Sequence, residues 1–343
     1  MKYYEVETDF KAYPDAWLYE AHSARSVGKT YGALKYCYQN NIKMLYLKRT
    51  QIDIELIINN DLFSPYKPIN RDLGTNIQFC KVYDGIASIT EDDKLLGYAM
   101  AMSAIHKYKG FDLSDVGIMI VDEFIPQLSE RVNRKEGELL LDLYMTVSRD
   151  REARGHPPLK LVLFANATEL YCPITETLQI IDELSELNSI KMEEGEHTVC
   201  KYLEDRGILL RKLEAEEEQT EMAVYKGMRN TKWAQMAFGG KFAYNDFSRI
   251  KKIPLKGMIC HIELQYNNNK YYIYQHRDNG LYYMCSSPSK PIETYDFDIE
   301  ADQRRFYLTW SMMLKNEVSD GNMFFEKYTG YNLIYNFTKV FKL

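Results

Sequence analysis

Two short motifs constrain the fold of this chain more than any other feature, and the first is a loop from Ser23 to Thr30. An apolar, strand-like stretch (16–20) precedes the loop, and a helix-compatible stretch (30–39) follows it. This order predicts a phosphate-binding loop, because the backbone N–H groups and the dipole at a helix start attract phosphate. The loop has Ser where the usual pattern begins with Gly. A bare Gly-Lys-Thr tripeptide also arises often by chance.

The residues of this loop predict how it would bind ATP. The ammonium group of Lys29 would reach the β- and γ-phosphates, and the hydroxyl group of Thr30 would bind Mg²⁺. The expected nucleotide-binding residues are the eight consecutive ones of the loop: Ser23, Ala24, Arg25, Ser26, Val27, Gly28, Lys29 and Thr30.

The second motif is an apolar run (118–121) followed by Asp122 and Glu123. It predicts a buried parallel strand whose carboxyl end presents two carboxylates. Asp122 would bind Mg²⁺ through water, and Glu123 would orient and deprotonate the attacking water. A strand ending in an ordinary acidic turn has the same pattern, but the phosphate loop upstream favours an ATPase. A glutamate directly after the metal-binding aspartate indicates hydrolysis rather than phosphoryl transfer to a small molecule.

Length and composition limit the class of protein. A chain of 343 residues can form two domains, and its net charge of −6 gives no overall sign of nucleic-acid binding. Its six cysteines include no Cys-x-x-Cys pair, which indicates reduced thiols in a cytoplasmic setting and argues against a zinc site. The apolar runs are strand-sized and the N-terminus lacks a signal pattern, so we expect no membrane segment and no export.

Charge is unevenly spread along the chain. Residues 176–221 are strongly acidic and read as solvated surface, whereas residues 228–256 contain seven basic residues and one acidic residue. The basic stretch includes Lys251, Lys252 and Lys256, which are the expected contacts to DNA phosphates. A solvated basic face explains the same composition equally well.

The pattern of apolar residues divides the chain into three parts. Residues 1–190 alternate strand-like and helix-like segments, which predicts an α/β ATPase domain with a central, mainly parallel sheet. Residues 191–227 read as a helical and irregular linker. Residues 228–343 begin with hairpins and end with helices, which predicts a small α+β domain.

Several segments together make the chain similar to a known family. They are Ala24–Thr30, Tyr46–Arg49, Val121–Phe124, Ser148–Glu152, Phe164–Ala167 and the hairpin end Asp278–Tyr283. In matching order over nearly the whole chain, they resemble the DNA-packaging motor ATPases of small short-tailed phages with terminal-protein-capped linear genomes. These ATPases are compact relatives of large terminases, within the additional-strand, catalytic-glutamate P-loop ATPases.

The resemblance implies a ring, of five subunits, that drives double-stranded DNA through the portal into a procapsid in the host bacterial cytoplasm. Whether a structural RNA bridges motor and portal stays open. Arg149 would be an arginine finger donated to the neighbouring subunit's ATP, and a basic helix end is the alternative reading. Asn166 would sense the γ-phosphate or the water, although asparagine often caps such a turn. Arg25 could touch the γ-phosphate or couple the nucleotide state to Glu123, and Lys109 is a second candidate cation acting in trans.

The resemblance also implies an RNase H-like fold for the C-terminal domain. A nuclease of that type needs clustered carboxylates holding two metals. Its opening strand has Cys260 and His261 near the position expected for an aspartate, so we expect a domain that binds nucleic acid or the capsid and does not cut. Three alternatives remain: a terminase-like ATPase with an active nuclease, a helicase-like cellular translocase, and a capsid-vertex protein with an inactive ATP site.

Overall fold

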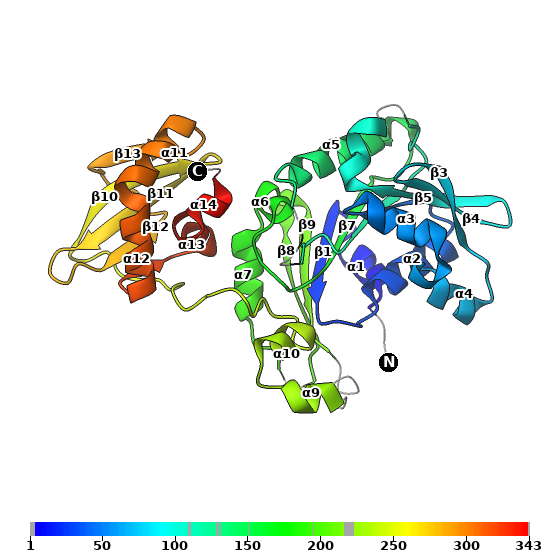
Figure 1. Ribbon diagram of the computed structural model, residues 1–343, viewed down its shortest axis with the longest axis horizontal. Coiled ribbons are helices and arrows are strands. Elements are labelled where there is room, and N and C mark those ends of the chain that lie inside the picture. Colours follow the sequence, from blue (N-terminus) through cyan, green and yellow to red (C-terminus); the bar gives the residue numbers. More distant parts are fainter. Residues whose placement is uncertain are drawn as a thin grey trace. The chain divides into compact units, whose positions relative to one another are not determined.

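The computed structural model describes residues 4–108, 111–127, 130, 132–149, 151–193, 195–215 and 223–341. The chain divides into two compact units, Met1–Tyr244 (unit 1) and Asn245–Leu343 (unit 2), and Figure 1 labels most of their helices and strands. Among the described residues, no helix combines the length and the apolar character that a membrane crossing requires.

Unit 1 is built on a nine-stranded sheet with the strand order β3-β4-β5-β2-β6-β7-β1-β9-β8. The six strands from β5 to β9 in that order are parallel, and antiparallel strands extend the sheet at both edges. In chain order the strands are β1 (Leu18–Ser23), β2 (Met44–Lys48), β3 (Gln78–Tyr83), β4 (Ile86–Glu91), β5 (Lys94–Ala101), β6 (Ile118–Asp122), β7 (Lys160–Asn166), β8 (Thr198–Leu203) and β9 (Ile208–Leu213).

Helices connect these strands, as the alternating pattern predicts. A capping box between Thr50 and Asp53 fixes the start of α3, since each side chain bonds the other residue's backbone N–H group. The α-helices are α1 (Val6–Ala12), α2 (Lys29–Gln39), α3 (Gln51–Asn59), α4 (Lys67–Leu73), α5 (Glu136–Ser148), α6 (Pro173–Thr177), α7 (Ile181–Ser189), α9 (Ala223–Met228) and α10 (Lys232–Ala237). Short 3₁₀ helices are η1 (Asp61–Phe63), η2 (Met102–Tyr108), η3 (Glu152–Arg154) and η4 (Glu204–Arg206).

The sheet order brings both sequence motifs to one edge. Strands β1, β2, β6 and β7 are buried along nearly their whole length, as near-continuous apolar runs require. Strand β7 lies between β1 and β6, and in register Ser23 pairs with Asn166 while Asp122 pairs with Phe164. The carboxyl ends of the parallel strands therefore meet at a single edge, where an open α/β sheet binds its ligands. The expected α/β fold with a large, mainly parallel sheet is confirmed.

The expected linker differs from the structure. Residues 198–213, inside the segment 191–227, form the β8–β9 hairpin, and β9 pairs in parallel with β1 along its whole length. The expected boundaries at 190 and 228 also differ from the unit boundary after Tyr244. The acidic residues around this hairpin suggested a linker, but the apolar run at its second strand belongs to the sheet core, where it is buried.

Unit 2 contains a mixed five-stranded sheet with the order β13-β10-β11-β12-β14. Strands β10, β11 and β12 form an antiparallel meander, and the two edge strands pair with it in parallel. The strands are β10 (Met258–Tyr266), β11 (Asn269–His276), β12 (Tyr282–Cys285), β13 (Glu293–Asp296) and β14 (Met323–Phe325). The helical segments are α11 (Glu300–Phe306), a π-helical turn η5 (Tyr307–Ser311), α12 (Met312–Asp320), α13 (Tyr328–Tyr335) and α14 (Phe337–Val340).

Candidate nucleotide site

The loop between β1 and α2 has the backbone of a phosphate cradle. Ser26 and Gly28 have positive φ angles of 62° and 74°, and Gly28 caps the start of α2. A hollow of about 560 Å³ opens beside the loop. Its lining consists of Ser26, Val27, Gly28, Lys29, Thr30, Tyr31, Asp122, Glu123, Phe164, Ala165 and Asn166. Five of the eight predicted loop residues, both carboxylates of the second motif and Asn166 therefore line one hollow, whereas Ser23, Ala24 and Arg25 do not.

Neighbouring backbone segments hold the first residues of this loop. The N–H groups of Ala24 and Arg25 donate to the carbonyl oxygens of Leu213 (2.9 Å) and Ala237 (2.8 Å). A Cβ atom at Gly240, where φ is 55°, would lie 2.5 Å from the oxygen of Leu213 and 2.9 Å from the nitrogen of Ala24. The turn after α10 thus contacts the loop so closely that only glycine fits there.

Lys29 lies at the base of the hollow, where its ammonium group donates to Ser23. Burial lowers the pKa of Lys29 to about 8, although the carboxylate of Asp122 acts in the opposite direction. A group with this pKa titrates near neutral pH, so its charge, and with it the attraction for phosphate, depends on pH.

Asp122 accepts hydrogen bonds from three side chains, which lie on two elements, α2 and β2. Its Oδ1 receives the hydroxyl of Thr30 at 2.9 Å, and its Oδ2 receives the hydroxyl of Tyr46 at 2.7 Å and the ammonium of Lys48 at 2.9 Å. Burial alone raises the pKa of Asp122, but the charge of Lys48 and these hydrogen bonds outweigh it and hold the pKa below its usual value. Asp122 is therefore a carboxylate at neutral pH.

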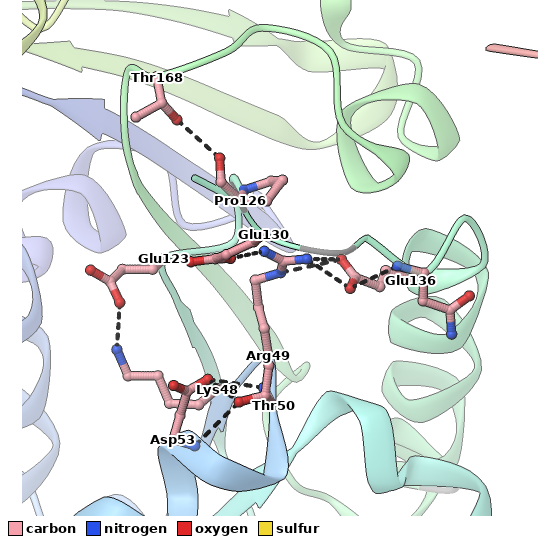
Figure 2. Close-up of polar contacts among 10 residues, drawn as sticks. Lys48, Arg49, Thr50, Asp53, Glu123, Pro126, Glu130, Glu136 and Thr168 are labelled. Atoms are coloured by element: carbon pink, nitrogen blue, oxygen red, sulfur yellow. Dashed lines mark hydrogen bonds and ion pairs between the residues drawn. The ribbon is translucent and has the colours of Figure 1, made fainter. Parts of the chain in front are cut away.

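Glu123 follows directly, in an unusual backbone conformation. Its φ angle is 58°, in the left-handed region that non-glycine residues seldom adopt, and its side chain is 57% exposed. Figure 2 shows its carboxylate joined to Lys48, whose ammonium lies 3.0 Å from Oε2. Burial lowers the pKa of Lys48, but the carboxylates of Asp122 and Glu123 more than compensate, so the net pKa is raised. Lys48 is a cation that both acidic side chains share.

A second hollow, of about 490 Å³, lies beside the same carboxylates. Next to it Arg49, which is buried, forms ion pairs with Glu136 at the start of α5 and with Glu130 (Figure 2). The lining of this hollow comprises Arg25, Lys48, Arg49, Asp53, Asp122, Glu123, Ile125, Gln127, Glu130, Asn166 and Thr168. Arg25 therefore lines the same hollow as Glu123 and Asn166.

The other predicted residues lie elsewhere. Arg149 caps the carboxyl end of α5, is exposed and is absent from the lining of both described hollows. Lys109 lies outside the described residues. Lys251, Lys252 and Lys256 are exposed in unit 2, where the ammonium of Lys251 lies 3.6 Å from the ring centroid of Phe324. In the part of unit 2 that the structure describes, no three His, Cys, Asp or Glu side chains are grouped closely enough to hold a metal ion.

Sequence reasoning missed two residues of the site. Tyr46 and Lys48 both reach Asp122 from β2. The signal in the sequence was their position, two residues apart at the carboxyl end of a strand, which puts both side chains on one face of the sheet. Using this signal required knowing that β2 is the neighbour of β6.

Comparisons with known proteins identify the family of the chain. Residues 15–316 match a protein family described as podovirus DNA encapsidation protein (Gp16). The chain belongs to this family. It is therefore a phage DNA-packaging protein, and the resemblance read from the sequence is confirmed. No curated protein matches the chain.

Two solved structures of packaging motors have the same fold as this chain over almost its whole length. The bacteriophage Phi-29 viral genome packaging motor assembly matches with a TM-score of 0.66 at 14% identity, covering 99% of both chains. The Phi-28 gp11 DNA packaging motor matches with a TM-score of 0.61 at 17% identity, covering 99% of this chain and 98% of the other. The fold is thus that of a DNA-packaging motor ATPase.

Proposed function

We propose that this protein hydrolyses ATP to drive double-stranded DNA into a viral procapsid, as one subunit of a ring. The observation that carries the proposal is the 2.9 Å hydrogen bond from Thr30 to Asp122, because it joins the two motifs at the edge of one sheet. ATP-driven motors require this junction of a phosphate loop with a metal-binding carboxylate.

The donor set at this junction fits Mg²⁺. The hydroxyl of Thr30 and the carboxylate of Asp122 are hard oxygen donors, which Mg²⁺ prefers, and they already lie within hydrogen-bond distance. When bound, Mg²⁺ supplies positive charge to the β- and γ-phosphate oxygens. Thr30 and Asp122 would hold it there, and Lys29 with the backbone of the loop (Ser23–Gly28) would bind the phosphates.

Hydrolysis needs a base and a further cation near the γ-phosphate. Glu123 would accept the proton of the attacking water, since its carboxylate is exposed to the hollow that the loop lines. Asn166 lines the same hollow and would contact the γ-phosphate or the water. Arg149 would come from a neighbouring subunit. Its exposure at the end of α5 supports this role, as does its absence from the lining of the hollows within its own described chain.

The assembly part of the proposal rests on the family. Five subunits would form the ring on the portal of a procapsid, in the cytoplasm of the host. Unit 2 would be an RNase H-like domain without nuclease activity, and its mixed five-stranded sheet supports that assignment. Lys251, Lys252 and Lys256 would contact DNA phosphates, which their exposure in unit 2 supports.

The test is steady-state ATP hydrolysis by the wild type and Glu123→Gln, across protein concentrations and with or without linear double-stranded DNA and portal-bearing procapsids. A wild-type rate that rises faster than linearly with concentration, increases with DNA and disappears in Glu123→Gln is the expected result. Lys29→Ala removes the ammonium group expected to bind the phosphates and should also abolish hydrolysis. Lys35→Ala, which changes another lysine of α2, is its matched control and should not. A rate strictly proportional to protein and indifferent to DNA and procapsids would contradict a ring-forming motor.

Mixed rings test the role of Arg149. Subunits carrying Arg149→Ala keep the base but lack the donated group, and subunits carrying Glu123→Gln keep the donated group but lack the base. Mixing the two should restore part of the activity at interfaces where a Glu123→Gln subunit donates Arg149 to an Arg149→Ala subunit. Complete inactivity at every ratio, with mixed rings verified, would exclude donation in trans.

A further inference from the structure

Two donors on β2 occupy the same oxygen of Asp122. The hydroxyl of Tyr46 lies 2.7 Å from Oδ2 and the ammonium of Lys48 lies 2.9 Å from it, while Thr30 takes Oδ1. The two residues are two positions apart on one strand, so both side chains point to the same face of the sheet. Tyr46 lies opposite Ile120 in the parallel pairing of β2 with β6, and Ile120 is two residues before Asp122, so Asp122 lies on that same face.

The two donors differ in charge and in burial. Tyr46 is 1% exposed, packs in the main core cluster of unit 1 and offers a neutral O–H group. Lys48 carries a positive charge at the rim of the second hollow and is shared with Glu123. A cation bound between Thr30 and Asp122 repels the ammonium of Lys48 and leaves the phenol of Tyr46 unaffected. Of the two donors to Oδ2, Lys48 is therefore weakened by a bound metal ion and Tyr46 is not.

We propose that Tyr46 is the positioning residue of the metal site: its hydroxyl holds Oδ2 of Asp122, so that Oδ1 faces Thr30 and the metal that accompanies the nucleotide. This inference rests on the proposed function, since it assumes that Asp122 and Thr30 bind that metal. A carboxylate whose rotation is already restricted loses less conformational freedom when it binds the metal. Removing a residue that hydrogen-bonds to a metal-binding side chain commonly lowers metal affinity about 10- to 100-fold.

The experiment compares Tyr46→Phe with Tyr66→Phe in the full chain. Tyr66 is a matched control because it is fully buried in the same core cluster and its hydroxyl contacts the sulfur of Met44 at 3.4 Å, not a carboxylate. Mn²⁺ binding in the presence of ADP is followed by the loss of the free-ion electron paramagnetic resonance signal, and ADP binding is measured separately in EDTA.

Tyr46→Phe should weaken Mn²⁺ binding by about tenfold and leave ADP affinity in EDTA unchanged. Tyr66→Phe should change neither quantity. Lys48→Met removes the other donor to the same oxygen together with its charge, and should leave Mn²⁺ affinity equal to the wild type or higher. This third variant tests the proposal even if Tyr46→Phe is too unstable to study.

The inference is overturned if Tyr46→Phe binds Mn²⁺ as the wild type does, if both phenylalanine variants weaken binding equally, or if Lys48→Met weakens it about tenfold. These results leave the proposed function intact, because the wild type still binds Mn²⁺ with ADP. A wild type that binds Mn²⁺·ADP no better than Lys29→Ala refutes the proposed function itself, and the role of Tyr46 with it.

Discussion

Removing Arg49 should strongly destabilise unit 1, because it leaves a buried carboxylate without its counter-charge. Its side chain is 5% exposed, and its Nη2 and Nε atoms lie 2.9 and 3.3 Å from the two carboxylate oxygens of Glu136, which is itself 10% exposed (Figure 2). In Arg49→Met, Glu136 would remain buried without its counter-charge, whereas Glu130 is 42% exposed and can be hydrated. Breaking such a buried pair costs about 3–5 kcal/mol.

A double-mutant cycle isolates this interaction. Replacing both partners, in Arg49→Met/Glu136→Met, removes the buried charges together and should bring stability back to within about 1 kcal/mol of the wild type. The coupling between the two positions is then about 3 kcal/mol or more, far above the spread seen for independent sites. Urea denaturation followed by far-ultraviolet circular dichroism measures all four proteins, and the single variants should also melt about 10 °C lower.

Two results would refute this reasoning. If Arg49→Met costs less than about 1 kcal/mol, the pair behaves like an exposed salt bridge. If the two single losses simply add in the double variant, the residues do not interact, whatever their distance. Since this pair joins the end of β2 to the start of α5, a positive result also shows that the helix ending at Arg149 is firmly attached beside Glu123.

Three further outcomes are expected. Burial lowers the pKa of Lys29 to about 8, so its charge is present below that pH and lost above it. ADP affinity, measured by calorimetry, should therefore fall about tenfold between pH 7 and pH 9. The same measurement on Lys29→Arg should show no such fall. Gly240→Ala should lower the free energy of unfolding by about 3 kcal/mol, and Gly74→Ala by about 1 kcal/mol. Both glycines have positive φ, but of the two only Gly240 has backbone atoms close to its Cβ position. Denaturation curves measure both changes. Neutralising Lys251 and Lys252 together should lower the slope of log Kd for DNA against log salt by about 2 in filter-binding titrations.

The motifs predicted which residues lie together at one edge of the sheet because each motif is local. An apolar strand followed by a loop or a carboxylate carries its own signal, and parallel strands bring their carboxyl ends to one edge whatever their order. The hairpins expected in residues 228–343 belong to the same class: β10 and β11 follow each other in sequence and pair antiparallel. Hairpin turns are set by neighbours in sequence.

What depends on distant partners could not be predicted from single segments. Strand β9 pairs with β1, whose residues lie about 190 positions earlier, and nothing in the acidic segment around β9 identifies that partner. Tyr46 and Lys48 became part of the site only because β2 lies beside β6. The Arg49–Glu136 pair likewise joins residues 87 positions apart. Register between strands and burial of charged pairs are properties of the assembled sheet.

The left-handed backbone of Glu123 implies that activity and stability compete at this position. A non-glycine residue with φ of 58° raises the free energy of the folded state by about 1–3 kcal/mol, and it also places a second negative charge next to Asp122. Asn tolerates this conformation better than Glu and is neutral. Glu123→Asn should therefore melt at a higher temperature than the wild type while losing hydrolysis, which would make the least active variant the most robust one.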